Sequence, residues 1–539
     1  MRSPIPQYDR QYMHRARYGK GVLAAVSGVA LALALPGFGL WPLAFVALVP
    51  LFWAQGTSRR LVPGMICGAV FFAIDLRWLL TLTRFTPLVV LGYAAVVVTL
   101  AVSFGLAGCV VGWARRRAGS AVALLAVAPA AFAALEILRA QGELGFGFSA
   151  AYLTLHRAPL LIQAASSFGP WALSAAIVFI NGAVCLALTR RRALWGAAVA
   201  LGTLALSAQL PMGPDGSVMQ VAIVGSDVEQ EMKLKGTELA TLAPYYLDRG
   251  REAAGDDPDL VVFPESILPA FILRDRELLG AFAALARTEG VALMLGTGDI
   301  EDSKIYNRVV LFSQQGDVVG TYAMMHPVPF GETVPGRAFL DRLGLGGLIR
   351  GMLPLDLTPG TEFSQLDGIG TPICFESTFP SPSRGFAVRG AQLLVTVTND
   401  AWFAGSSELI SHFATAAFRA VETRRYVIQA ANGGLSGVVD PRGRVLQSAV
   451  GETLLTERVA RRDGVTAYAR YGELPFLVLL LAVLLGAGTW RGAEAAIVPF
   501  LQAEADDEGG PSRRPPHVPA AVQRALTDAP QGRCCPRSA

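Results

Sequence analysis

Long apolar runs separated by short polar or basic connections occupy the first 211 residues of this 539-residue chain. The runs cover about 21–35, 39–55, 61–82, 87–113, 119–138, 160–189 and 193–211. Most approach the length of about 20 residues that one bilayer crossing needs. We therefore predict a cytoplasmic N-terminus at 1–20 and seven transmembrane helices over 21–211, the first retained and not removed as a signal peptide.

Positive charge is distributed unevenly among the connections. Arginines collect at 59–60, 115–117 and 190–192, which are alternate connections, and the N-terminal stretch is also basic. By the positive-inside rule these segments are cytoplasmic, so the chain after the seventh helix emerges on the outer side. A last transmembrane helix at 473–490 then returns it to the cytoplasm, where the charged, proline-rich tail at 491–539 is predicted to be disordered.

Between these helices, residues 217–462 alternate short β-rich runs with helical patterns. Strands are predicted at 218–224, 260–263, 291–295, 308–312, 318–323, 372–375 and 393–398, and helices at 237–253 and 274–288. This alternation indicates a layered α/β domain with functional side chains at the strand ends.

Composition supports a membrane protein with a soluble part. Hydrophobic residues make up 52% of the chain and charged residues 16%, which is too apolar for an ordinary soluble enzyme. The net charge of +4 arises from arginines between apolar runs, a distribution that reflects topology and not a nucleic-acid partner. The six cysteines offer no disulfide framework or CxxC spacing, so redox and zinc sites are not favoured. No metal or organic cofactor is expected, because chemistry at a cysteine needs only a thiolate, a base and an oxyanion donor.

Three side chains of the soluble segment are candidates for chemistry. Cys374 is its only cysteine and ends the predicted strand 372–375, where a thiol is either a nucleophile or a buried small hydrophobe. Glu265 follows an apolar strand at a proline-stiffened turn, a setting that raises a carboxyl pKa and suits a general base; the alternative is a helix cap or surface carboxylate. Glu332 lies in a loop with two prolines, where it is either a residue of the site or a structural carboxylate of the loop. His412 is interpreted as structural, because spacing alone does not establish a Cys–His pair.

Four motifs occur in a characteristic order: Phe-Pro-Glu265, Pro-Phe-Gly-Glu332, Ile-Cys374-Phe-Glu376 and Thr-Asn-Asp-Ala-Trp402-Phe403. In this order they resemble the nitrilase superfamily, which uses a Glu-Lys-Cys triad. With seven predicted helices before them and one after, residues 20–490 resemble the bacterial apolipoprotein N-acyltransferases.

This resemblance implies a polytopic α-helical membrane domain plus a nitrilase-like αββα sandwich. It implies a monomeric, multi-pass protein of the bacterial cytoplasmic membrane with its catalytic domain on the outer face. The implied reaction takes an acyl chain from a membrane phospholipid, holds it as a cysteine thioester, and transfers it to the α-amino group of diacylglyceryl-cysteine apolipoproteins.

The resemblance also implies roles for individual residues. Glu265 is the general base and Cys374 the nucleophile. Glu332 and Glu376 support the site, and Phe375 packs beside the thiol. The aromatic pair Trp402 and Phe403 is expected to bind substrate.

One triad position departs from the family pattern. The family's lysine falls two residues after a strand tyrosine, and counting from Tyr322 gives Met324. Methionine has neither an N–H group nor a charge, so it cannot stabilise a thiolate or an oxyanion. The family's tryptophan after the first strand is likewise replaced, by Leu234.

Three accounts of the missing lysine stay open. Another lysine enters the site, Lys304 being the nearest in sequence; backbone N–H groups and His326 suffice; or the chain is a catalytically impaired homologue that binds lipid or lipoprotein. The chain's other lysines are Lys20, Lys233 and Lys235. A related carbon–nitrogen hydrolase or amide-forming enzyme with a different acceptor is a further hypothesis.

Overall fold

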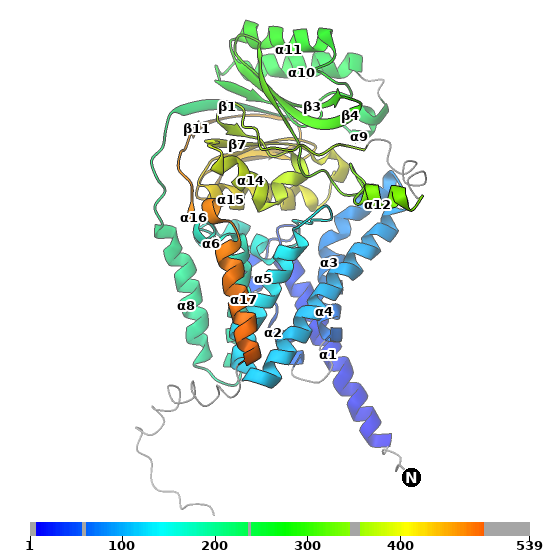
Figure 1. Ribbon diagram of the computed structural model, residues 1–539, viewed down its shortest axis with the longest axis vertical. Coiled ribbons are helices and arrows are strands. Elements are labelled where there is room, and N and C mark those ends of the chain that lie inside the picture. Colours follow the sequence, from blue (N-terminus) through cyan, green and yellow to red (C-terminus); the bar gives the residue numbers. More distant parts are fainter. Residues whose placement is uncertain (1–6, 56–60, 236–238, 345–355, 490–539) are drawn as a thin grey trace, which may run out of the picture. The chain divides into compact units, whose positions relative to one another are not determined.

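The computed structural model describes residues 7–55, 61–235, 239–344 and 356–489 (Figure 1). Its N-terminal part is helical. The elements are α1 (Gln7–Ala34), η1 (Trp41–Phe45), α2 (Val49–Ala54), α3 (Leu61–Asp75), η2 (Leu76–Arg84), α4 (Val89–Val122), η3 (Ala123–Val127), α5 (Ala128–Arg139), η4 (Ala151–Arg157), α6 (Ala165–Phe168), α7 (Pro170–Ala187), α8 (Ala193–Leu206) and η5 (Ser207–Gln209). Two more helices, α16 (Ala467–Tyr471) and α17 (Leu474–Thr489), follow the sheets.

Each predicted apolar run coincides with helical structure. Within the described residues, the segments 61–84, 89–139 and 170–187 are long and apolar enough to cross a membrane, and shorter apolar helices lie at 19–34, 41–54, 193–209 and 474–486. The predicted runs 87–113 and 119–138 form consecutive helical structure over 89–139 that is kinked at Gly119, where the backbone leaves helical geometry at φ 81°. That all seven runs cross the bilayer stays a prediction. The tail at 491–539 lies outside the described residues.

The second part contains two sheets packed face to face. Their strand orders are β11-β1-β2-β3-β4-β5 and β10-β9-β8-β7-β6. The strands are β1 (Val218–Gly225), β2 (Leu260–Val262), β3 (Ala292–Glu301), β4 (Lys304–Phe312), β5 (Val318–Ala323), β6 (Ile369–Gly370), β7 (Leu393–Asn399), β8 (Val427–Asn432), β9 (Leu435–Val439), β10 (Val445–Val450) and β11 (Thr453–Ala460). β1, β2 and β3 run parallel to one another, as do β6, β7 and β8.

Helices cover the outer face of each sheet. The first sheet carries α10 (Leu239–Ala254) and α11 (Arg276–Glu289), and the second carries α14 (Pro380–Val388) and α15 (Glu408–Thr423) (Figure 1). The short helices α9 (Gln230–Lys235), α12 (Arg337–Arg342), η6 (Cys374–Thr378) and η7 (Asp400–Phe403) follow strand ends or loops. The predicted αββα sandwich is therefore confirmed, with α15 also contacting α6 and η4 of the helical part.

One strand prediction needs correction, and some strands were missed. The predicted strand at 372–375 is wrong as a continuous strand, because β6 ends at Gly370, only Ile373 forms an isolated parallel bridge with Val397 of β7, and Cys374 begins the short helix η6. Pro372 has no N–H to give to a sheet, and the N–H of Ile373 donates to the Glu376 side chain instead of a neighbouring strand. The four strands after residue 426 were not predicted.

Candidate active site

The predicted catalytic residues gather at one end of the two sheets. Glu265 follows β2, Met324 follows β5, and Cys374 follows β6. Asn307, near the start of the antiparallel strand β4, reaches the same end and donates from Nδ2 to Glu265 Oε1 at 2.5 Å. The ends of parallel strands thus bring together side chains that lie up to 109 residues apart in sequence.

Cys374 lies in a strained turn. Its φ is +46°, a left-handed conformation that is uncommon for residues other than glycine and is concentrated at functional sites. The turn is held by Glu376, whose N–H donates to the Ile373 carbonyl at 2.9 Å and whose Oε2 accepts from the Ile373 N–H at 3.0 Å. This pairing fixes the backbone that presents the thiol.

The other oxygen of Glu376 ties this turn to the loop after β5. Oε1 accepts from Tyr322 Oη at 2.7 Å and from the Met325 N–H at 3.1 Å, and His326 Nδ1 lies 3.4 Å away. Because Glu376 is fully buried and occupied by these partners, its geometry suits a supporting role.

Glu265 is buried, with 4% of its surface exposed. Burial raises the pKa of this carboxyl group, while hydrogen bonds from Asn307 and the Cys374 thiol oppose the rise. Its second oxygen, Oε2, accepts no hydrogen bond of standard geometry from the described residues. A carboxylate adjoining a thiol in this way suits a general base.

Glu332 is close enough to Glu265 for their charges to interact. Burial and the charge of Glu265 raise the pKa of Glu332 to about 8, although the Val328 N–H donates to its Oε2 at 2.8 Å. Two such carboxyl groups do not readily ionise together, so protonation of Glu332 favours ionised Glu265.

Met324 occupies the triad lysine position and is 1% exposed. Its Sδ lies 3.7 Å from Nδ2 of Asn307, the residue that donates to Glu265. An uncharged side chain therefore lies where the family has a lysine. Lys304 does not replace it, because it is exposed at the turn between β3 and β4, in register with Glu301. The hypothesis that Lys304 enters the site is therefore wrong.

Sequence reasoning missed Lys233 as a residue of the site. It belongs to α9, is 7% exposed, and interacts electrostatically with Glu265. Burial lowers the pKa of Lys233 to about 7, against the opposing effect of the Glu265 charge. Sequence distance from Met324 gave no indication of this proximity.

His412 also contributes more than its sequence position indicates. It is 1% exposed on α15, with Nδ1 2.9 Å from Asp400 Oδ1 and Nε2 3.0 Å from the Cys374 carbonyl oxygen. Glu408 Oε1 lies 3.7 Å from Nδ1. Since both ring nitrogens face acceptors, the imidazole is protonated, and Asp400 raises its pKa to about 9 although burial acts in the opposite direction.

Asp400, Glu408 and His412 have ligand atoms within 4.8 Å of one another, which makes them the candidate metal-binding group within the described chain. The His412–Asp400 contact is already explained by a hydrogen bond from the imidazole Nδ1–H to the carboxylate.

The aromatic candidates connect the sheets to the helical part. Phe375 contacts Phe148 with ring centroids 6.2 Å apart. Trp402 contacts Phe85 at 5.1 Å, and Phe403 contacts Trp78 at 4.9 Å. Substrate binding by Trp402 and Phe403 stays a prediction, but these contacts give both rings a position beside η2.

Arg84 strengthens the same junction. Its Nη2 donates to the carbonyl oxygens of Ala401 and Trp402 at 2.6 and 3.0 Å. The end of η2 is thus bonded directly to the loop that follows β7.

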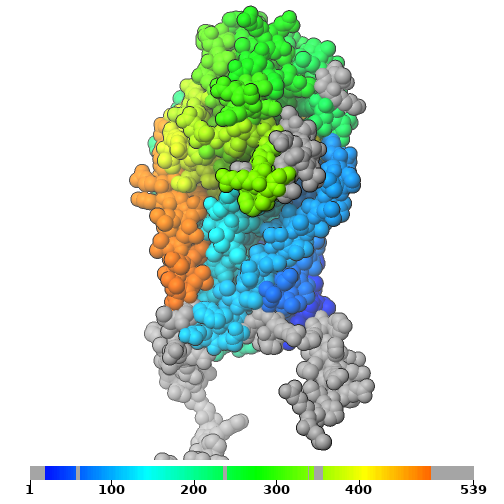
Figure 2. Space-filling model, turned by 45° about the vertical axis from the view of Figure 1, so that its right-hand side comes forward, coloured from blue at the N-terminus to red at the C-terminus, as the bar shows by residue number. Residues whose placement is uncertain are grey.

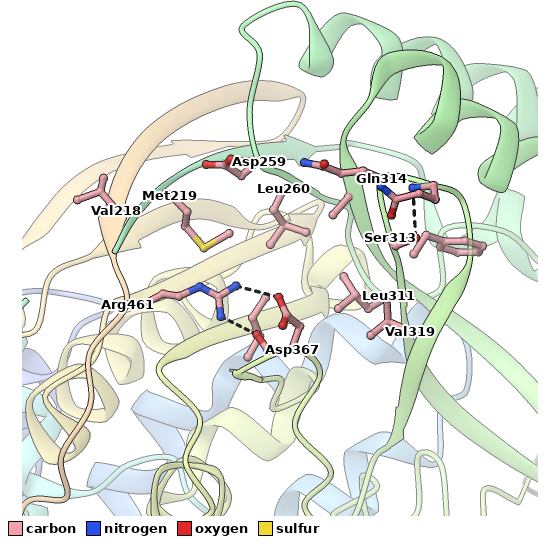
Figure 3. A pocket seen from close by; sticks show the side chains of 14 residues that line it. Val218, Met219, Asp259, Leu260, Leu311, Ser313, Gln314, Val319, Asp367 and Arg461 are labelled. Atoms are coloured by element: carbon pink, nitrogen blue, oxygen red, sulfur yellow. Dashed lines mark hydrogen bonds and ion pairs between the residues drawn. The ribbon is translucent and has the colours of Figure 1, made fainter. Parts of the chain in front are cut away.

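A separate hollow of about 460 Å³ lies at the opposite ends of the strands (Figure 3). Its lining includes the first residues of β1 and β2 and the ion pair between Arg461 and Asp367. Because Glu265 and Cys374 follow the other ends of their strands, this hollow is distinct from the catalytic cluster.

Comparison with known proteins agrees with this arrangement. Residues 27–183 match the apolipoprotein N-acyltransferase N-terminal domain, and residues 219–467 match the carbon-nitrogen hydrolase family. Among solved structures, Saccharomyces cerevisiae Nit3, a member of branch 10 of the nitrilase superfamily, is 20% identical with a TM-score of 0.35, covering 46% of this chain and 92% of its own.

Curated relatives extend over both parts of the chain. The apolipoprotein N-acyltransferase of Geobacter metallireducens is 31% identical over 482 residues, covering 84% of this chain and 92% of the relative. That of Allorhizobium ampelinum is 32% identical over 473 residues, covering 80% and 87%. With its membrane-type helices and nitrilase-like sheets in one polypeptide, the chain belongs to the apolipoprotein N-acyltransferase family of enzymes.

Proposed function

We propose that this protein transfers an acyl chain from a membrane phospholipid to the α-amino group of diacylglyceryl-cysteine apolipoproteins, through a thioester on Cys374. The observation that carries the proposal is the Cys374 thiol beside the buried Glu265 carboxylate, on a turn with positive φ. Membership of the family supports an apolipoprotein acceptor, and the phospholipid donor is part of the proposal.

The first half-reaction forms the thioester. Glu265 accepts the thiol proton, the sulfur attacks the ester carbonyl carbon, and a C–S bond forms. The C–O bond then breaks, and the proton passes from Glu265 to the leaving oxygen of the lysophospholipid. Glu332 and Glu376 hold the surrounding loops, and Phe375 packs beside the thiol.

The second half-reaction uses the same residues. The amino nitrogen of the apolipoprotein attacks the thioester carbonyl and forms a C–N bond, while Glu265 accepts the amine proton. The C–S bond then breaks, and the proton passes from Glu265 to sulfur to regenerate the thiol. One site thus serves two lipid substrates in turn, as covalent catalysis permits.

An apolar segment beside the site suits lipid access. Phe330, Phe339 and Leu343 are 66%, 64% and 56% exposed, and the Gly336 N–H of this segment donates to Glu143 Oε2 in the helical part at 2.7 Å. Figure 2 shows the segment in yellow-green at the junction of the two parts. The protein is proposed to act as a monomer in the bacterial cytoplasmic membrane with this site on the outer face, an orientation that the arginine distribution supports.

A catalytically impaired homologue is the second candidate, because Met324 lies at the lysine position. Loss of one preorganised donor typically costs roughly a hundred- to thousandfold in rate. Such a protein binds lipid or lipoprotein without transferring acyl chains.

The two candidates are separated by an acyl-transfer assay. Full-length protein in phospholipid vesicles is incubated with a synthetic diacylglyceryl-cysteine peptide, and the peptide mass is followed. We expect N-acylation that is abolished by Cys374→Ala and Glu265→Gln and retained by the control Cys109→Ala, since Cys109 lies exposed on α4. Binding of the peptide without any gain of mass in the wild type would establish the impaired homologue.

A further inference from the structure

The surroundings of Cys374 are rich in negative charge. The charges of Glu265, Asp400 and Glu332 all raise the pKa of its thiol, in addition to the larger effect of burial. Glu376 and Glu408 are buried nearby. Since transfer of the thiol proton to Glu265 moves negative charge onto sulfur without removing it, the thiolate needs a compensating positive charge.

Few cations of the described structure are placed to provide it. His412 is paired with Asp400 at 2.9 Å, so its charge is already balanced. His326 lies 3.4 Å from Glu376 and its side chain is 35% exposed. Arg419, on the same helix as His412, is paired with Glu422 at 2.6 Å.

Lys233 differs from all of these. Its Nζ is buried and has no hydrogen-bond partner among the described residues. A buried ammonium without a charge partner destabilises the folded protein strongly. Its position therefore points to an interaction with a nearby negative charge, and Glu265 is the group that interacts with it electrostatically.

The helix that carries Lys233 is fixed to the catalytic strand ends. Asn399, the last residue of β7, donates from Nδ2 to Gln230 Oε1 at 2.7 Å. Asn432, the last residue of β8, accepts from the Val228 N–H and donates to the Val228 carbonyl, both at 2.8 Å. Asn432 also donates to Asn399 Oδ1 at 2.9 Å, so both anchors of α9 are coupled.

We propose that Lys233 supplies to the Glu265–Cys374 pair the positive charge that Met324 lacks, and that it acts as a positioning residue through Glu265. Before proton transfer the ammonium keeps Glu265 ionised and able to accept the proton. After transfer it offsets the charge on sulfur. This inference deepens the proposed acyl transfer and rests on it for its biological role.

The test measures Cys374 itself and does not require acyl transfer. Full-length protein in detergent is treated with iodoacetamide between pH 6 and 10, and alkylation of the Cys374 peptide is quantified by mass spectrometry. Lys233→Met removes the charge while keeping a long apolar side chain, and such a replacement of a buried charge need not destabilise the fold. Lys304→Met is the matched control at an exposed position.

We expect Lys233→Met to slow alkylation at pH 6.5, where Lys233 with its pKa of about 7 is mainly protonated, by at least about tenfold, which is the effect of a one-unit change in the ionisation of the thiol. The difference should shrink as the pH rises above 7 and Lys233 loses its proton. Lys233→Arg and Lys233→Met/Met324→Lys should restore the rate, and Lys304→Met should leave it unchanged. Restoration also shows that the variant background is folded. An unaltered profile in Lys233→Met would overturn the inference.

A parallel acylation assay separates this inference from the proposed function. If alkylation depends on Lys233 but the wild type transfers no acyl chain, the proposed function fails and the electrostatic role stands. If acyl transfer occurs with equal rates in the wild type and Lys233→Met, the function stands and the role of Lys233 is refuted.

Discussion

Replacing His412 by asparagine should remove a buried positive charge from behind the nucleophile turn. Asparagine retains an N–H donor for Asp400 but carries no charge. His412 and Asp400 are each 1% exposed, and Nδ1 lies 2.9 Å from Oδ1. The groups facing this imidazole are Asp400, Glu408, the carbonyl oxygen of Cys374 and the Ser377 hydroxyl, which lies 2.9 Å from Nε2.

The magnitude follows from the raised pKa. A rise from 6.5 to about 9 corresponds to about 3 kcal/mol of stabilisation of the charged form, at about 1.36 kcal/mol for each pKa unit. Because the folded-state pKa is above the unfolded one, this stabilisation is complete below pH 6.5 and is lost as the pH rises through 9.

Thermal unfolding of the full-length protein in detergent checks this expectation. At pH 6, His412→Asn should lower the unfolding midpoint by roughly 6–12 °C, from about 2–4 °C for each kcal/mol in a domain of this size. At pH 9.5 the difference should largely vanish. Adding Asp400→Asn to both proteins completes a double-mutant cycle in which Glu408 is constant.

The reasoning is refuted if His412→Asn has the same effect at pH 6 and pH 9.5. It is also refuted if the cycle gives no coupling between His412 and Asp400 at pH 6.

Two further predictions concern the position and ionisation of Glu265. A Cβ added at Gly296 would lie 2.5 Å from the Glu265 Cα, so Gly296→Ala should displace the base and slow thioester formation by about a hundredfold. The control Gly298→Ala places its Cβ 3.1 Å from the Phe271 ring and should change the rate far less. Equal rates for the two variants would contradict this prediction. Burial raises the pKa of Glu265, and the Asn307 hydrogen bond opposes that rise. The rate of thioester formation in a single-turnover pH profile should therefore fall as the pH falls through this raised pKa, and Asn307→Ala should move this acidic limb to higher pH. A limb that stays in place argues against Glu265 as the base.

Local sequence patterns were sufficient for much of the fold. The apolar runs predicted the helical elements because the length of an apolar run can be read directly from contiguous residues. The predicted strands from 218 to 323 and the catalytic candidates Glu265 and Cys374 followed from apolar runs that end in polar motifs. The strand at 372–375 failed because a side chain, that of Glu376, takes the Ile373 N–H that a sheet would use.

The position of Lys233 was not predictable from spacing. Lys304 is closer to Met324 in sequence, but it lies at the start of β4, three residues before Asn307. At 3.3 Å for each residue, this places Lys304 about 10 Å along the strand from Asn307. Lys233 approaches Glu265 because β1 and β2 are adjacent parallel strands and because two asparagines from β7 and β8 hold the segment that follows β1. Those contacts are made between residues more than 160 positions apart.

The most direct test of the central claim is the intact mass of the purified wild-type protein after incubation with a phospholipid of defined acyl composition. We predict a mass increase of one acyl chain that is removed by hydroxylamine, maps to Cys374, and is absent from Cys374→Ala. A wild type that gains no mass, alongside a Met324→Lys variant that does, would contradict the claim that this chain forms the thioester with methionine at the triad position.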